Sequence, residues 1–324
     1  MVTTVKPGWS RPAAILFASE IPVNEKAFGF ALTEAAEFGA ELILFHAYDT
    51  PAFPPSTGKF SPSIGLGAQC DYLSCQAERQ RLEPLAQRAT NLGIHCKVVV
   101  RPGPAGEQII SMVRERRIDR VVMGTHSPGP IGKLLVGSVA EYVLRNSPVP
   151  VNVVGPEVVE GAYRRVKSRT ILCSLGANES RGVVALFAAE LAIRHRAKLI
   201  LQQVIPPQTS DEVLEGRTLG ELEAELPALL PQKLQSMVGV ASRAVYGDPT
   251  EELLYQGRSL HANLIVLGAQ GISKFAAITR AGIFYKVLAY AQCPVITLSP
   301  IVLSVCGTNA DRLNPAEMCL SGVF

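Results

Sequence analysis

Short, continuously apolar runs alternate along the chain with longer segments whose apolar positions recur at helical spacing. In the first half the apolar runs lie at residues 14–18, 42–47, 97–100, 120–123 and 151–154. Runs that are apolar throughout, rather than at every second position, are typical of parallel strands covered on both faces. The segments between them predict helices at residues 24–38, 69–91, 105–117 and 138–146. This order predicts an α/β domain built on a five-stranded parallel sheet.

The second half of the chain repeats the first. At an offset of 144 residues, the segment DRVVMG at 119–124 matches NLIVLG at 263–268, and Pro-Val at 150–151 matches Pro-Val at 294–295. The repeat predicts a second set of strands at residues 170–174, 199–204, 241–245, 264–267 and 295–298. A period near 150 residues indicates a duplicated domain, because the units of solenoid proteins are only about 20 to 50 residues long.

The two copies differ in length. Upstream of the matching blocks the offset grows to about 156, so the first copy carries about 13 extra residues. These residues fall in the Pro-, Gly- and Ser-rich stretch 50–67, whose composition predicts a loop. Pro84 predicts that the helix after this loop is kinked or split. We therefore expect a first domain at 1–155, a second domain at 165–300 and a C-terminal tail at 301–324.

The duplication predicts two tandem doubly wound sheets, each with the common strand order 3-2-1-4-5. In this order the last strand of each copy, 151–154 or 295–298, lies at an edge of its sheet, and an unprotected apolar edge favours pairing. The short linker between the copies raises the effective concentration of one edge near the other. We expect an intramolecular pseudo-dimer through these strands, with a homodimer of two chains as a further, weaker association.

Charge and cysteine content exclude several classes of protein. Lys and Arg number 31 against 28 Asp and Glu, a net charge of +3, which gives no electrostatic footprint for nucleic acid. The most apolar helical stretch, 182–193, is short and is interrupted by Glu190, so we expect no membrane span. Seven cysteines without the paired spacing of a metal or redox motif indicate reduced thiols in a cytoplasmic protein.

Candidate ligand-binding residues follow the strands that border the predicted crevice. In a doubly wound sheet the crevice lies beyond the carboxyl ends of the strands, where the strand order reverses, here between the first and fourth strands. The strand-end candidates are Ser19 and Glu20 after the first strand, His46 at the end of the second, and Gly124 with Thr125 after the fourth. The loop that leads from there into the next helix adds Ser127, Gly129, Lys133, Gly137 and Ser138. Backbone amides of a glycine-rich loop and a helix N-terminus can together hold a phosphate group.

The same segments closely resemble the universal stress protein family. The residues that carry the resemblance are GTH at 124–126, LLVGSVAE at 134–141 and SPVPV at 147–151, and the likeness covers both halves, roughly residues 10 to 300. It implies an adenine-nucleotide alpha-hydrolase-like fold. In nucleotide-binding members, a glycine-rich signature holds the phosphates of ATP. It consists of Gly, two residues, Gly, nine residues, and then Gly-Ser or Gly-Thr. An acidic residue after the first strand and the end of the second strand hold the adenosine.

The two copies depart from this signature to different degrees. The first copy keeps Gly124, Gly137 and Ser138 but has Ser127 in place of the second glycine and Glu20 in place of the usual aspartate. Because Pro128 follows, Ser127 is restricted to extended geometry. The second copy keeps glycines at 268 and 271 but has Ala-Gly at 281–282 and a glycine, Gly176, at the acidic position. We expect the first copy to bind ATP, or AMP or ADP, with Mg possible alongside ATP, and the second site to be degenerate.

Several candidate residues also have a purely structural interpretation. Ser138 and Glu141 have the spacing of a capping box, so they can start a helix as well as meet a phosphate. Gly124 can simply end a strand, Lys133 can be a solvated loop charge, and His46 can pack rather than line an adenosine pocket. Any ATP hydrolysis should be slow or absent, because the sequence marks no general base or metal-ligand cluster. The alternative function is a stress scaffold that binds no nucleotide and acts through its protein surfaces.

Overall fold

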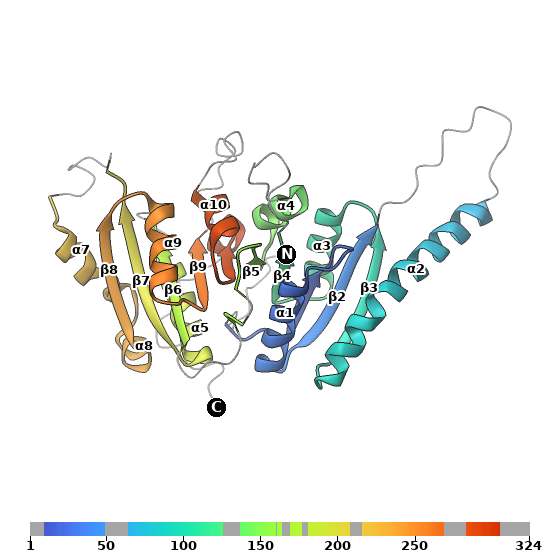
Figure 1. Ribbon diagram of the computed structural model, residues 1–324, viewed down its shortest axis with the longest axis horizontal. Helices are drawn as coiled ribbons and strands as arrows, with labels where there is room; N and C mark the ends of the chain where they lie inside the picture. Colours follow the sequence, from blue (N-terminus) through green and yellow to red (C-terminus); the bar gives the residue numbers. More distant parts are fainter. Residues whose placement is uncertain are drawn as a thin grey trace.

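The computed structural model describes residues 10–48, 64–125, 137–159, 161–163, 169–176, 181–207, 216–268 and 283–304. The strands of the first half are β1 (Ala14–Ala18), β2 (Glu41–Tyr48), β3 (Cys96–Pro102), β4 (Arg120–Gly124) and β5 (Val151–Val154). Those of the second half are β6 (Arg169–Leu175), β7 (Ala197–Ile205), β8 (Val240–Tyr246), β9 (Leu264–Gly268) and β10 (Val295–Leu298). All ten form one sheet with helices on both faces (Figure 1).

The strand order is β3-β2-β1-β4-β5-β10-β9-β6-β7-β8. Each half therefore has the predicted order 3-2-1-4-5. The last strands of the two halves, β5 and β10, meet at the centre of the sheet, and the third strands, β3 and β8, form its outer edges. All neighbouring strands are parallel except β5 and β10, which pair antiparallel with Val153 opposite Val295 and Val151 opposite Thr297. The predicted pseudo-dimer is confirmed, and its seam is the pair of last strands.

The helices of the first half lie where the sequence predicts them. Those of the second half differ from their counterparts between β7 and β8. The first half has α1 (Glu25–Phe38), α2 (Ile64–Asn91), α3 (Ala105–Glu115) and α4 (Ser138–Asn146). The second half has α5 (Arg181–His195), α7 (Leu219–Glu225), the 3-10 helix η1 (Leu226–Leu229), α8 (Gln232–Met237), α9 (Pro249–Ser259) and α10 (Ile283–Tyr290). Short helical pieces thus stand between β7 and β8, where the first half has the single long helix α2.

One local prediction about α2 was wrong, and part of another, that Pro84 kinks or splits the helix, is contradicted. Residues 64–67, predicted as the end of a loop, are the first turn of the helix. Their two glycines each cost about 1 kcal/mol of helix propensity, which disfavours a helix without forbidding one. Pro84 does not split the helix, since α2 continues through it to Asn91. The rest of the predicted loop, 50–63, lies outside the described residues.

The core consists of two apolar layers, one on each face of the sheet. Phe17 of β1 packs with Phe28 of α1 in one layer, and Leu16 packs with the residues of α3 and α4 in the other. Both layers continue across the β5–β10 seam, where Val154 belongs to one and Val153 to the other. The halves therefore share a core. No described helix is both long enough and apolar enough to span a lipid bilayer.

A buried set of charged side chains also joins the halves. We call it the junction cluster, and it consists of Glu34, Glu37, Arg120, Arg169 and His195. Arg120 is fully buried and donates to Glu34 Oε2 at 2.6 Å within the first half. Arg169 of the second half donates to both carboxylate oxygens of Glu37 at 2.7 and 2.8 Å. Glu37 therefore ties helix α1 of the first half to strand β6 of the second.

Candidate functional site

The carboxyl ends of β1, β2 and β4 meet at the crevice of the first half, and they bring Ser19, His46 and Gly124 together. The Ser19 N–H donates to the carbonyl of Phe45 at 2.8 Å, which continues the β1–β2 ladder past its last residue. His46 Nδ1 lies 2.9 Å from the Ser19 carbonyl, and because a carbonyl only accepts, this nitrogen carries a proton. The His46 side chain therefore links the end of β2 to the residue that follows β1 through a hydrogen bond.

The opposite edge of the His46 ring, which carries Nε2, points towards helix α2. Its Nε2 lies 3.8 Å from Glu78 Oε2, and the imidazole is 13% exposed. Ser19 is 8% exposed, and its hydroxyl donates to the carbonyl of Glu20 at 3.0 Å. Glu20 follows directly and is half-buried. Short local bonds therefore order the chain at the carboxyl ends of β1 and β2, where Ser19 and Glu20 lie.

Gly124 is required by a close approach of Asn24. A Cβ atom at position 124 would lie 2.5 Å from Asn24 Nδ2 and 2.7 Å from its Cγ, so only glycine fits without a shift. Asn24 is held there because it caps α1, its Oδ1 accepting from the Ala27 N–H at 3.0 Å. Sequence analysis did not single out Asn24. An asparagine at the very start of a predicted helix, here 24–38, is the N-cap signal that could have found it.

Thr125, the residue after Gly124, has a buried hydroxyl group. Its N–H donates to the Val154 carbonyl at 3.1 Å, which fixes the backbone beside β5. The residue is 5% exposed, and among the described residues its hydroxyl has no hydrogen-bond partner. A buried hydroxyl without a partner is uncommon in a native fold and calls for an explanation, such as a ligand or a bound water.

Helix α4 begins at Ser138, 13 residues after Thr125. Residues 126–136 lie outside the described residues, so the predictions for Ser127, Gly129 and Lys133 do too. The N-cap of α4 is Gly137, with φ −58° and ψ 153°, and no side chain caps the helix. Ser138 is the first helical residue and is exposed.

The capping box predicted for Ser138 and Glu141 was wrong. Because the N-cap lies one residue earlier, the Glu141 N–H bonds to the Gly137 carbonyl at 2.9 Å instead of to a serine hydroxyl. The Glu141 carboxylate pairs with Arg145 at 2.9 Å, one turn along the helix. The first turn of α4 therefore has backbone N–H groups that no side chain of its cap residue satisfies, and they remain free to meet an anion.

The crevice of the second half is lined differently. A Cβ atom on Gly268, the counterpart of Gly124, would lie 2.9 Å from Val184 Cγ2 and 3.7 Å from Leu303 Cδ1. Val184 and Leu303 are 4% and 2% exposed, so apolar side chains fill the space beside this glycine. Gly176 follows β6 and brings no carboxylate. Residues 269–282, which include the other signature positions, lie outside the described part of the chain.

One group of described residues has the composition of a metal site. Ligand atoms of Glu34, Glu37 and His195, all in the junction cluster, lie within 4.8 Å of one another. Arg169 Nη1 lies 2.7 Å from both Glu37 Oε1 and His195 Nδ1, and Arg120 neutralises Glu34. A divalent cation would add two charges to a buried set that the arginines already balance, so the group acts as an ion-pair junction.

Comparisons with known proteins agree on the ancestry of both halves. The model of the universal stress protein family matches residues 14–155 and again residues 167–299. A universal stress protein of Methanocaldococcus jannaschii is 27% identical over 137 residues, which cover 41% of this chain and 75% of that protein. One from Thermus aquaticus is 29% identical over 127 residues, covering 39% of this chain and 86% of that protein.

Solved structures match the whole two-half architecture. A universal stress protein from Archaeoglobus fulgidus has a TM-score of 0.66 at 19% identity and covers 91% of this chain and 98% of its own. A functionally unknown protein from Pseudomonas aeruginosa has a TM-score of 0.60 at 14% identity, with coverage of 95% and 100%. At these identities the likeness establishes the fold. With the family matched once in each half, the chain belongs to the universal stress protein family as a tandem member.

Proposed function

We propose that the first half binds ATP or a related adenine nucleotide in the crevice beyond β1 and β4. The observation that carries the proposal is the buried Thr125 hydroxyl, which has no partner among the described residues and stands beside Gly124 at the point where the strand order reverses. The uncapped first turn of α4 supports a phosphate position. The family signature at Gly124, Gly137 and Ser138 supports the nucleotide class.

Each candidate residue takes a distinct part in this proposal. The N–H groups at the start of α4, with Ser138, meet the phosphates, and Thr125 donates its hydroxyl to the same ligand. Ser19 and Glu20 face the ribose, while His46 orders the strand ends that form the adenosine side. Ser127, Gly129 and Lys133 complete the phosphate loop, and Mg accompanies ATP but not AMP. We expect hydrolysis to be slow or absent, because the sequence marks no general base or metal-ligand cluster.

The packing of the second half supports the degenerate site that the sequence predicts there. Val184 and Leu303 pack beside Gly268, and burying phosphate charge against such side chains is costly. Leu303 and Val302 belong to the segment after β10 and are each 2% exposed. We therefore propose that the second domain, which starts at 165, extends beyond 300 to at least Ser304. The first domain remains 1–155.

Free thiols at Cys75, Cys96, Cys173 and Cys293 support a cytoplasmic location.

The test is a calorimetric titration of ATP into the protein and two variants of Gly137. No atom of the described residues lies within 4 Å of a Cβ at this position and its φ is ordinary, so both Gly137→Asp and Gly137→Asn should fold. Both side chains can cap α4 and raise apo stability by a few tenths of a kcal/mol. Only Asp adds a negative charge, so it should bind ATP at least tenfold more weakly than Asn. Equal affinities of the two variants would contradict the proposal, as would two nucleotides per chain.

A further inference from the structure

The two outer edges of the ten-stranded sheet are built differently. Strand β3 forms one edge and β8 the other. In Figure 1, α2 runs beside β3 and extends beyond the sheet, while α7 and α8 stand at the β8 end. An outer strand presents every second backbone N–H and C=O away from the sheet, and proteins usually cover or block these groups.

At the β8 edge the chain blocks itself with a carboxylate. Hydrogen bonds join Leu199 N to the Gly239 carbonyl and Gly247 N to the Ile205 carbonyl, so the odd-numbered residues of β8 face β7. The N–H of Ala244 therefore points outward. Glu223 of α7 accepts from it, with Oε2 3.1 Å from the Ala244 nitrogen. An acidic side chain thus occupies the free edge of the second half.

The β3 edge has no such partner among the described residues. The Leu42 N–H donates to the His95 carbonyl and the Gly103 N–H to the Tyr48 carbonyl, so the odd-numbered residues face β2. The outward N–H groups belong to Cys96, Val98 and Val100. At the repeat offset of 144, Val100 corresponds to Ala244. The described part of the chain provides no carboxylate that bonds to it.

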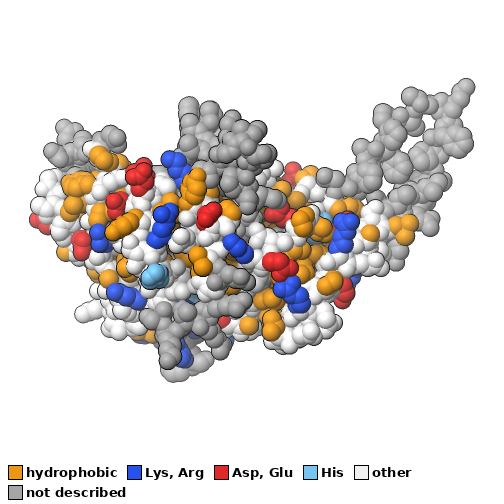
Figure 2. Space-filling model, in the orientation of Figure 1, with side chains coloured by type: hydrophobic (Ala, Val, Ile, Leu, Met, Phe, Trp, Pro, Cys, Tyr) orange, Lys and Arg blue, Asp and Glu red, His pale blue; other side chains and the backbone are white. Residues whose placement is uncertain are grey.

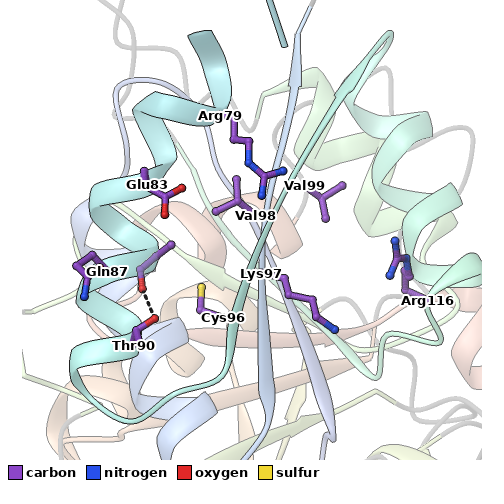
Figure 3. A pocket seen from close by; sticks show the side chains of 10 residues that line it. Arg79, Glu83, Gln87, Thr90, Cys96, Lys97, Val98, Val99 and Arg116 are labelled. Carbon is purple, nitrogen blue, oxygen red and sulfur yellow. Dashed lines mark hydrogen bonds between the residues drawn. The ribbon is translucent and has the colours of Figure 1, made fainter. Parts of the chain in front are cut away.

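A groove of about 360 Å³ lies along this open edge. It is lined by Arg79, Glu83 and Gln87 of α2, by residues 96–99 of β3, and by Arg116 after α3 (Figure 3). The two sides of the groove belong to opposite faces of the sheet, since Val98 packs towards α2 and Val99 towards the α3 face. A ligand in the groove would therefore meet the strand edge itself, with side chains above and below it.

The groove carries more positive than negative charge. Arg79, Lys97 and Arg116 line it against Glu83 alone. The described residues include no ion pair with Arg79 or Arg116, and Lys97 is bonded to Glu41 at 2.6 Å while remaining 51% exposed. Burial first, then Glu83 and Glu41, raises the pKa of the Cys96 thiol to about 11, so the thiol adds no charge at neutral pH. Elsewhere on the face drawn in Figure 2, basic and acidic side chains are interspersed.

We propose that the β3 edge is a docking site for an extended acidic segment of a partner protein, which adds to the sheet as an eleventh strand. Backbone bonds to the outward N–H groups of Cys96, Val98 and Val100 supply affinity, as in other cases of strand addition. Acidic side chains at alternate positions meet Lys97 and Arg116 on one face. A second copy of this chain fits poorly, because pairing two β3 edges would bring like charges together. The proposal does not depend on nucleotide binding.

The test uses a fluorescent peptide of alternating Glu and Val, seven residues long and blocked at both ends, with anisotropy as the measure of binding to the full chain. Arg116→Glu should weaken binding at least tenfold. Arg114→Glu is the matched control, since Arg114 is also exposed but does not line the groove, and it should change affinity less than threefold. Equal effects of the two substitutions would overturn the proposal, because binding would then follow net charge alone.

Two N-methylated peptides test the backbone pairing. Methyl groups on one alternate set of peptide amides should abolish binding, and on the other set leave it nearly unchanged, because an added strand uses only one of its edges. Amide exchange should slow at Val98 and Val100 and stay unchanged at Ala244, whose N–H Glu223 already holds. Tolerance of both methylated sets would overturn the proposal. So would a dimer of the chain that competes with the peptide, since a second copy would then occupy the edge.

Discussion

Glu37→Gln tests whether the junction cluster holds the two halves together. Glu37 lies on α1 of the first half and accepts from Arg169 of β6 and from His195 of α5 in the second. Arg169 is 8% exposed, so removing the carboxylate charge leaves a nearly buried guanidinium without its counter-ion. The substitution keeps the size and one acceptor oxygen of the side chain. Its effect therefore isolates the charge.

The magnitude follows from the pKa of Glu37. Burial alone would raise it, but the hydrogen bonds with His195 and Arg169 and their charges outweigh burial and lower the pKa from 4.5 to about 2. At about 1.4 kcal/mol per pH unit, this corresponds to at most ~3.5 kcal/mol of stability at neutral pH. Because the folded-state pKa is depressed, the stabilisation is complete above about pH 5 and is lost as the pH falls towards 2. We expect Glu37→Gln to cost about 2 kcal/mol at pH 7.

The assay is urea unfolding of both proteins between pH 7 and pH 2.5, followed by circular dichroism. The difference in unfolding free energy should be about 2 kcal/mol at pH 7 and should shrink as the pH approaches 2.5. Glu25→Gln is the matched control on the same helix, because its ion pair with Arg88 is 49% to 63% exposed and should contribute less than about 0.5 kcal/mol. A difference that is absent at pH 7, or that stays constant with pH, would refute the reasoning.

Two further predictions concern glycines that the packing requires. Gly124→Ala should destabilise the first half by about 1 to 3 kcal/mol, because the added methyl group would contact Asn24. In thermal unfolding, the double variant with Asn24→Ala should recover part of this loss. Strictly additive effects of the two substitutions would contradict the contact. Gly155→Ala should cost at least about 2 kcal/mol, because its Cβ would strike the backbone carbonyl of Leu288 across the seam. Gly182→Ala in α5, where a Cβ meets nothing within 4 Å, should instead be neutral or stabilising by about 0.5 kcal/mol.

The central strands were predictable because they are buried on both faces. Such strands are apolar along their whole length, so their positions and the duplicated order could be identified from the sequence to within one or two residues at most ends. The connection between β7 and β8 could not be inferred from the repeat. Glu221 and Thr218 form a capping box there that starts α7, and Pro227 and Pro231 end one short element and begin the next. The described counterpart in the first copy is the single helix α2, so the repeat gives no indication of these short elements.

The junction cluster and the cap of α4 escaped prediction for different reasons. Glu37 and Arg169 are 132 residues apart, and no local pattern marks two such charges as partners. Their pairing is a consequence of the seam between the halves. The capping box at Ser138 was wrong because serine and glutamate at the right spacing fit equally well one residue inside a helix. Gly137 takes the cap position, and the sequence alone does not distinguish these two registers.

The two crevices show how one repeat can keep its fold and change its chemistry. In the first half a polar side chain, Asn24, stands beside the glycine that ends β4, and the next residue, Thr125, has a buried hydroxyl without a partner in the described structure. In the second half Val184 and Leu303 take the corresponding space beside Gly268. An anion needs hydrogen bonds to replace those it loses from water, and apolar side chains offer none. The asymmetry agrees with the proposal of one nucleotide per chain, whereas both halves contribute to the shared core and the continuous sheet.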